Sequence, residues 1–487
     1  MIPPIADLES IRDQTVVGPE MIDEIESIGQ GLSALAERQT RLADLAGIDS
    51  AIAPTWLDVF NGYAGVLVVS FLIALIATPI MRHLALANGV IDHPSDPRKV
   101  HRMPIAYLGG AAVYLGIMGG ILFSYFGVHQ SFLVEYHDLP SVPFGQPDPR
   151  FVPPWILLGI TVIMVIGLID DGTGISPRVK VGGQLLAAAA LAYGDIGVKV
   201  AAGVLGPTIG QLLGNPELVF TIDLGGEFPL VGSVIELDVT YWTGTAVIAI
   251  FVLGACNASN LIDGLDGLLS GTTAIATVGL LAISLLVVFT DPGPRDAQRI
   301  ILCMALLGGC LGFLPHNFNP ATIFLGDCGS LMLGYATIVI ILMLGDTGRT
   351  DLVVAGLIVY AIPIIDTVLA IVRRKMAGKS MSDPDSDHLH HMLKRAFGVK
   401  GAVLVLYGMG LSFATLGVLL AASGVRVIYT LALLVVSFIV VYSTKIARRK
   451  AHEEQSMRTA IPSASSGSKP AHGKNPDREH VEAGSTA

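Results

Sequence analysis

A short polar stretch, residues 257–268, lies between two long apolar runs of the sequence. It places two amides and two carboxylates within a few helical turns of each other, namely Asn257, Asn260, Asp263 and Asp266. Such groups beside membrane-length apolar runs are costly in lipid and therefore indicate function. Their oxygens are hard ligands that suit a cation such as Mg²⁺, and the intervening glycines let a bound group approach the backbone. The stretch predicts a cation-dependent site.

Two further acidic groups stand directly beside apolar runs. The pair Asp170 and Asp171 follows the run 163–169. Adjacent carboxylates raise each other's proton affinity, so one of them can act as a base near neutral pH. Asp327 opens another apolar run, as a metal ligand would. The simpler alternatives are a water-facing helix end for the pair and a helix N-cap for Asp327.

Three histidines, His388, His390 and His391, lie in a long basic loop after the ninth apolar run. A zinc site would need a cysteine or carboxylate at ligand spacing, and only Asp387 is close enough in the sequence. The same region also carries Arg373, Arg374, Lys394 and Arg395. This many basic side chains favours a receptor for an anionic group, with a solvated loop as the simpler alternative.

The composition indicates the class of protein. Of 487 residues, 52% are hydrophobic and 14% are charged, and the mean hydropathy is +0.65. These values are typical of a polytopic membrane protein. The net charge of −10 averages acidic loops and basic gaps, and nothing in it favours nucleic acid as a partner. The four cysteines lie in or beside apolar runs without metal-ligand spacing, so we expect packing residues and no disulfide framework.

About eleven apolar runs are long enough to cross a bilayer. They cover approximately residues 63–86, 107–128, 153–169, 178–194, 241–258, 269–290, 300–316, 329–345, 352–372, 402–422 and 426–443. We therefore predict an all-α fold, a polytopic helical bundle in the lipid bilayer formed by residues 58–444. Within the segment 195–240, residues 196–213 suit a re-entrant or interfacial piece. Residues 1–57 are expected to form an extracytoplasmic amphipathic segment without a cleavable signal peptide, and residues 445–487 a disordered cytoplasmic tail.

The distribution of Lys and Arg predicts the orientation, because short cytoplasmic loops collect these residues. If the first span runs from outside to inside, the basic gaps are cytoplasmic, the N-terminus lies outside and the C-terminus lies inside. Every polar group described above then falls on the cytoplasmic face. Lys99 and His101 lie on the same face in the first inside loop, although a short basic loop alone is only a topology signal.

Together these groups predict a divalent cation, several carboxylates and a surplus of basic side chains at the cytoplasmic surface of a membrane bundle. That combination suits a phosphorylated substrate, above all a diphosphate, that meets a lipid-borne partner. A cation-coupled transporter is the non-enzyme alternative. It is disfavoured because an ion path should carry polar groups at mid-membrane or on both sides.

In order and spacing, these motifs resemble those of the polyprenyl-phosphate N-acetylhexosamine-1-phosphate transferases, of the glycosyltransferase family 4 type. The motifs are Asp170-Asp171, Asn257-x-x-Asn260-x-x-Asp263-Gly264-x-Asp266-Gly267-Leu268, Phe324-Leu325-Gly326-Asp327-x-Gly329-Ser330 and Asp383-Pro384-Asp385-Ser386-Asp387-His388-Leu389-His390-His391. They are specific as a set, and the resemblance covers roughly residues 60–443. The His388-x-His390-His391 spacing is more similar to the branch that transfers N-acetylglucosamine phosphate than to the phospho-N-acetylmuramoyl-pentapeptide branch, where three adjacent histidines are usual. Family members often carry Asp or Lys at the position of Gly174, which receives no role here.

The resemblance implies a reaction at the bacterial cytoplasmic membrane. The oxygen of undecaprenyl or decaprenyl phosphate would attack the β-phosphorus of a UDP-N-acetylhexosamine, giving a polyprenyl-diphospho-sugar and UMP. This step would initiate lipid-linked cell-envelope glycans such as O-antigen or teichoic acid. Mg²⁺, with Mn²⁺ as an alternative, is the implied cofactor. Because many relatives are dimers, a homodimer is also expected.

The resemblance also implies a role for each matched residue. Asn260 and Asp327 would hold the metal, and Asp170 or Asp171 would act at the lipid phosphate as a base or an orienting group. The implied substrate-binding residues are Lys99, His101, Asn257, Asp263, Asp266, Arg373, Arg374, His388, His390 and His391. Since a phosphate monoester is already an anion at neutral pH, direct attack needs no strong base. The closest rival function is transfer of phospho-N-acetylmuramoyl-pentapeptide, which a panel of sugar donors would separate.

Overall fold

The computed structural model describes most of the chain. The described residues are 54–92, 104–130, 132–139, 148–228, 232–376, 378, 388–423, 427–430 and five single residues between 433 and 445. The predictions for the N-terminal segment before Pro54 and for the tail after Lys445 therefore fall outside the described residues. The same holds for Lys99 and His101.

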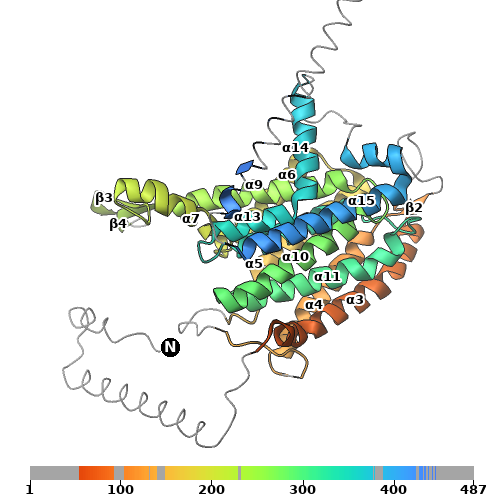
Figure 1. The fold of residues 1–487 in the computed structure, drawn as a ribbon, viewed down its shortest axis with the longest axis horizontal. Coiled ribbons are helices and arrows are strands. Elements are labelled where there is room, and N and C mark those ends of the chain that lie inside the picture. The colour runs from red at the N-terminus through yellow and green to blue at the C-terminus, as the bar shows by residue number, and fades with distance from the viewer. Residues whose placement is uncertain are drawn as a thin grey trace, which may run out of the picture.

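The described chain forms a bundle of long apolar helices (Figure 1). The helices are α3 (Trp56–Ala87), α4 (Gly109–Gly127), α5 (Pro154–Thr173), α6 (Pro177–Tyr193), α9 (Val239–Ile262), α10 (Leu268–Thr290), α11 (Asp296–Asn317), α12 (Gly326–Met343), α13 (Thr350–Val359), α14 (Ala361–Met376) and α15 (Leu389–Ala421). Eight of them are long and apolar enough to cross a membrane, and two bent pairs raise that number to ten. The predicted polytopic helical fold is confirmed, whereas the last predicted run, 426–443, lies largely outside the described residues.

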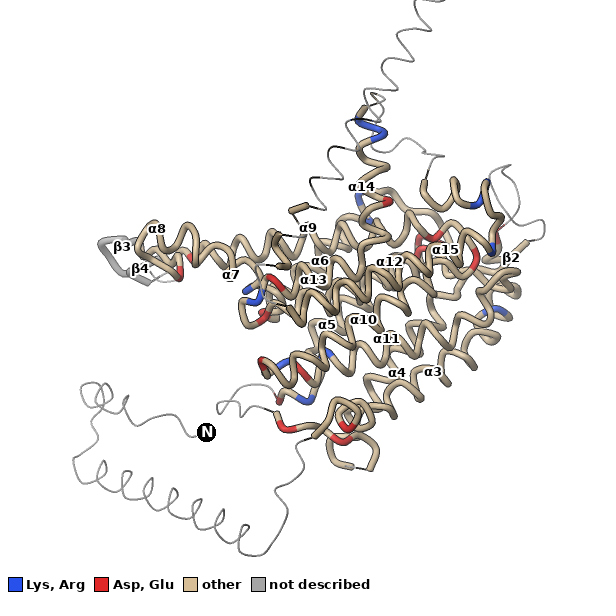
Figure 2. Tube along the Cα trace, viewed as in Figure 1, with Lys and Arg blue, Asp and Glu red and all other residues tan. Residues whose placement is uncertain are grey.

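Charged residues lie toward the ends of the long helices, while the middle of α10 and α11 carries none (Figure 2). This separation is the one that a bilayer imposes, because an unpaired charge in hydrocarbon is costly. All four cysteines are buried and free, as expected for packing residues.

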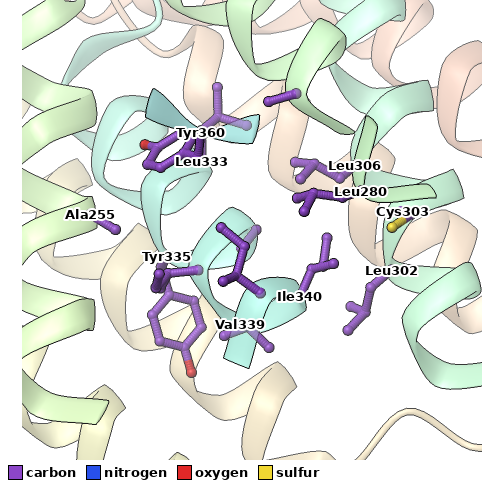
Figure 3. Close-up of a cluster of buried hydrophobic side chains, with 14 of the residues drawn as sticks. Ala255, Leu280, Leu302, Cys303, Leu306, Leu333, Tyr335, Val339, Ile340 and Tyr360 are labelled. Carbon is purple, nitrogen blue, oxygen red and sulfur yellow. The ribbon is translucent and has the colours of Figure 1, made fainter. Parts of the chain in front are cut away.

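Helix α12 lies at the centre of the bundle and is buried from Cys328 to Met343. Glycines let its neighbours approach closely: a Cβ added to Gly110 of α4 would lie 2.1 Å from the Gly329 nitrogen, and one added to Gly167 of α5 would lie 2.4 Å from the Cys328 Cα. Figure 3 shows side chains of α12 surrounded by those of α9, α10 and α11, with Ala255, Leu280, Leu302, Cys303, Leu306, Leu333, Tyr335, Val339 and Ile340 labelled. Close packing on all sides fixes where the N-terminus of α12, and with it Asp327, can lie.

Two short strands join the first loop of the bundle to the start of α12. Strand β1 (Ile91–Asp92) pairs antiparallel with β2 (Ile105–Ala106) on either side of residues 93–103. The Phe324 N–H donates to the Ala106 carbonyl at 2.9 Å, and the Gly110 N–H donates to the Leu325 carbonyl at 2.8 Å. The described ends of this loop therefore lie beside the Asp327 motif.

The segment after α6 turns by 82° and leaves the bundle as an arm (Figure 1). Its elements are η2 (Val198–Ala201), α7 (Ala202–Leu205), η3 (Gly206–Gly210), α8 (Gln211–Leu213) and the antiparallel strands β3 (Val219–Phe228) and β4 (Gly232–Asp238). Asp346 holds the base of the arm: its Oδ1 accepts from the Gly197 N–H at 2.9 Å and its Oδ2 pairs with Arg295 at 2.6 Å. That residues 196–213 form a re-entrant or interfacial piece stays a prediction, because a bend of this kind also occurs in a broken span, and the hairpin was not predicted.

The predicted run 352–372 is a bent pair, α13 and α14, with an angle of 80° between its helices. Pro363 lies in the first turn of α14, where a missing backbone N–H is tolerated. At the bend, the Tyr360 hydroxyl forms a hydrogen bond with the Ser259 hydroxyl of α9. Hydropathy cannot register this bend, because both helices are apolar.

Candidate active site

An acidic cluster with one lysine lies where α5 ends and where α6 and α12 begin. The Lys180 Nζ lies 2.6 Å from Asp170 Oδ2 and 2.5 Å from Asp327 Oδ2. Asp170 is held from the other side by the Ile175 N–H, which donates to its Oδ1 at 2.8 Å. Gly174, with φ of +67°, reverses the chain after α5 and so allows α6 to return toward the acidic pair.

Lys180 is a site residue that the sequence analysis missed. It lies in one of the basic gaps between apolar runs, which indicated only topology there, because a single lysine beside a membrane carries no stronger signal. Its place in the first turns of the helix that follows the acidic pair could have indicated a role. Only the fold, however, brings it to Asp327, which lies 147 residues further along the chain.

Asp171, the second member of the acidic pair, caps α12. Its two carboxylate oxygens accept from the Asp327 N–H at 2.7 Å and from the Cys328 N–H at 3.0 Å. A helix N-terminus carries unpaired N–H donors and partial positive charge, and both favour a carboxylate there. A Cβ on Gly326 would lie 2.5 Å from Asp171 Oδ2, so glycine is needed for this approach. The two members of the acidic pair therefore differ: Asp170 faces the lysine, and Asp171 positions Asp327.

We expect Asp171→Ala to lower the stability of the protein more than Asp170→Ala does. The alanine leaves two backbone donors of α12 without a charged acceptor, a loss of about 1–3 kcal/mol. Thermal unfolding of both variants in the same detergent measures the difference. Equal melting temperatures for the two variants would contradict the capping role.

The two predicted metal ligands lie side by side. The Asn260 side-chain amide donates to Asp327 Oδ1 at 2.8 Å and to the Ser330 hydroxyl at 3.0 Å. Asn257, one helical turn earlier on α9, instead donates to Gln184 of α6 at 3.0 Å. The structure therefore joins Asn260 to the acidic cluster and places Asn257 at the packing contact between α9 and α6.

The two remaining carboxylates of the polar stretch differ in their surroundings. Burial, together with the negative charges of Asp327 and Asp171, raises the pKa of Asp263 to about 8. Asp266 Oδ2 accepts from the Asn319 side chain at 2.8 Å and from the Ala321 N–H at 3.0 Å. Asp263 thus belongs electrostatically to the acidic cluster, while Asp266 ties the polar stretch to the loop after α11.

The three histidines begin α15 and pack together. The rings of His388 and His390 are stacked with centroids 5.5 Å apart, and those of His390 and His391 lie 4.3 Å apart. His390 also contacts the polar stretch, since a Cβ on Gly264 would lie 2.4 Å from its Nε2. Arg373 lies with Arg374 in the last turn of α14, which rises away from the bundle (Figure 1). The fold thus brings the histidines, but not the last turn of α14, onto the polar stretch.

The residues of the cluster fit a divalent cation. Within the described ranges, no group of three or more His, Cys, Asp or Glu side chains has the arrangement of a metal site. Asn260 and Asp327 nevertheless supply hard oxygens, and among the described ion pairs Lys180 is the one cation that contacts the carboxylates of this cluster, which are Asp170, Asp171, Asp263 and Asp327. A hard cation with a preference for oxygen relieves such a surplus of negative charge.

Comparison with known proteins identifies the family. The model of the family described as "Glycosyl transferase family 4" matches residues 154–345. A Bacillus subtilis protein named "Probable undecaprenyl-phosphate N-acetylglucosaminyl 1-phosphate transferase" is 31% identical over 388 residues, which cover 78% of this chain and 90% of that protein. The chain belongs to glycosyl transferase family 4. It is a multi-pass membrane enzyme of the phosphoglycosyltransferase class, as the resemblance of its motifs implied.

Two further relatives have names that describe different transferases. A Mycolicibacterium smegmatis protein named "Decaprenyl-phosphate N-acetylglucosaminephosphotransferase" is 31% identical over 69% of this chain and 76% of its own length. A Desulforudis audaxviator protein named "Phospho-N-acetylmuramoyl-pentapeptide-transferase" is 31% identical over 62% of this chain and 82% of its own length. The segment matched by the family model contains Asp170, Lys180, Asn260 and Asp327, whereas the histidines of α15 lie beyond its end.

Proposed function

We propose that this enzyme transfers an N-acetylhexosamine-1-phosphate, most simply N-acetylglucosamine-1-phosphate, from a UDP-sugar to a polyprenyl phosphate and releases UMP. The single observation that carries the proposal is the joining of Asp170, Lys180, Asn260 and Asp327 at one end of a membrane bundle. The names of the Bacillus and Mycolicibacterium relatives support the lipid acceptor and the sugar. The product would begin a lipid-linked glycan of the bacterial envelope.

The orientation follows from the charge bias of the loops. We place the site on the cytoplasmic face of the inner membrane, with the N-terminus outside and the C-terminus inside. The bundle formed by residues 58–444 is the transferase domain in this proposal. The acceptor reaches the site from the bilayer and the donor from water, and a homodimer is the expected assembly.

Each polar residue of the cluster has a place in the proposed reaction. Asn260 and Asp327 would hold Mg²⁺, or Mn²⁺ in its place. Such an ion would supply positive charge to offset the donor diphosphate and the charge that develops on the departing UMP. Lys180 offers an ammonium group to the phosphate of either substrate, and Asp170 orients that ammonium group. Asp171 keeps the start of α12 in place, so that the Asp327 carboxylate meets the cluster.

Further predicted residues would serve the donor in this proposal. His391 of the histidine cluster at the start of α15, together with Asp263, would face the nucleotide sugar, and Lys99 and His101 would add phosphate contacts from the first loop. Because the lipid phosphate is already an anion at neutral pH, we favour direct attack on the donor β-phosphorus over a covalent aspartyl intermediate. No strong base is then required of Asp170.

Release of UMP by the purified protein tests the proposal. With undecaprenyl phosphate, Mg²⁺ and a panel of UDP-sugars, we expect release with UDP-N-acetylglucosamine and its loss on addition of EDTA. Heat-treated protein and omission of the lipid are the controls. Release only with the UDP-N-acetylmuramoyl-pentapeptide donor would move the enzyme to the rival branch. No release with any donor from folded protein, combined with cation flux in sealed vesicles, would favour the transporter.

A further inference from the structure

Asp366 of α14 is a buried carboxylate that the proposed reaction does not use. Only 1% of its surface is exposed. Its Oδ2 lies 2.9 Å from His388 Nδ1, and its Oδ1 accepts from the Leu389 N–H at 2.7 Å. One carboxylate therefore fixes the orientation of the first histidine and caps the first turn of α15.

The position of Asp366 is set relative to the acidic cluster. Helix α14 starts at the bend after Tyr360, and the Tyr360 hydroxyl is hydrogen-bonded to the Ser259 hydroxyl. Ser259 directly precedes Asn260, which contacts Asp327. Asp366 follows the bend by less than two helical turns. A short chain of fixed contacts thus connects the metal-binding residues to the carboxylate that holds α15.

The histidines differ in their access to a ligand. His388 and His390 are 5% and 2% exposed, while His391 is half-buried. His390 lies between the other two: its Nδ1 is 3.9 Å from Asp366 Oδ2, and its ring packs on Gly264. Buried rings cannot touch a donor that arrives from water. His388 and His390 are therefore a support, and His391 is the ring of this cluster that can meet the donor.

We propose that Asp366 is a positioning residue for the sugar donor: through His388 and His390 it holds His391 at the edge of the polar stretch. This inference rests on the proposed function, because it assigns a role toward the donor of that reaction. The start of α15 is held rigidly because the Asp366 carboxylate is hydrogen-bonded to the His388 ring and to the Leu389 backbone N–H at the same time. Both hydrogen bonds of the Asp366 carboxylate go to the start of α15, so we expect binding of the lipid acceptor to be independent of them.

The variant Asp366→Asn tests this role in the full-length protein. Asparagine keeps the size of the side chain but removes the charge and one of the two acceptors. Loss of a partner that orients a functional histidine costs about 10- to 100-fold where it has been measured at metal sites. We expect a similar fall in kcat/KM for the UDP-sugar, carried mainly by a higher KM, with an unchanged KM for undecaprenyl phosphate. An equal rise of both KM values, or no change in either, would overturn the proposal.

A double-mutant cycle with His391→Ala separates positioning from general damage. If Asp366 acts through His391, Asp366→Asn will add little to the loss already caused by His391→Ala. If the two losses multiply, Asp366 does not act through that histidine. Wild-type protein is measured alongside the variants. An inactive wild type would contradict the proposed function. An active wild type, with activity losses in the two variants that multiply, would contradict only the role of Asp366.

Asp351→Asn is the matched control. Asp351 is also a buried carboxylate of the same bent pair, 3% exposed, but it lies on α13 and pairs with Arg349 at 2.8 Å. The same substitution there should lower the melting temperature without changing the KM for the donor. A donor KM that rises equally in both variants would show that the effect of Asp366→Asn is a general loss of packing.

Discussion

Asp327→Ala is expected to abolish UMP release, by about 10³-fold or more, while the protein remains folded in detergent. Asp327 is the residue at which the motifs converge, because it contacts both Lys180 and Asn260. In the proposed reaction it also holds the metal that neutralises the donor diphosphate. Loss of about 4 kcal/mol of transition-state stabilisation corresponds to that rate factor.

The fold should survive this change for a specific reason. The Asp171 carboxylate accepts a hydrogen bond from the backbone N–H of Asp327, which the alanine variant keeps. The cap of α12 therefore remains. Lys180 also keeps Asp170 as a partner. Thermal unfolding and gel filtration check whether the variant is folded. The control variant is Asp291→Ala, because Asp291 is a partly exposed carboxylate at the opposite end of the bundle. Turnover near that of the wild type would remove Asp327 from the site.

Lys180→Met should lower kcat/KM by about 10²- to 10³-fold, the range seen when one preorganised donor is removed from an active site. The substitution keeps most of the side-chain length but removes the only cation that the described contacts place between Asp170 and Asp327. The two carboxylates then repel each other, and the substrate phosphates lose an ammonium partner.

Arg178→Met provides the matched control for this second prediction. Arg178 lies in the same first turns of α6 and is also basic, but it is exposed. It should retain nearly full activity, since an exposed charge of this kind contributes little beyond topology. If Lys180→Met and Arg178→Met had equal activity, Lys180 would have only the topological role that sequence analysis assigned to it.

Asp171 caps α12 and Asp170 pairs with Lys180, but the sequence did not indicate which of the two adjacent carboxylates has which role. Two adjacent carboxylates after an apolar run predict a site, but they are equivalent by composition. Successive residues of a helix point about 100° apart, so neighbours face different partners. Only the packing of α12 against α5 decided that Asp171 faces backbone N–H groups and Asp170 faces Lys180.

The sequence by itself determined the membrane-helical class and most of the spans, because lipid requires long apolar runs with satisfied backbones and tolerates polar groups only at particular places. For the same reason the stretch around Asn260 and the residue Asp327 stood out without a structure. Their spacing also indicated the family, which the comparisons show.

Tertiary structure alone decided the contacts that join distant segments. Lys180 meets Asp327 across 147 residues, and Asp366 meets the first turn of α15 through a bend that hydropathy does not register. The hairpin of β3 and β4 likewise could not be predicted from apolar runs of membrane-spanning length. Hydropathy reports the solvent that each segment meets, whereas these contacts depend on which side chains the packed helices bring within hydrogen-bonding distance.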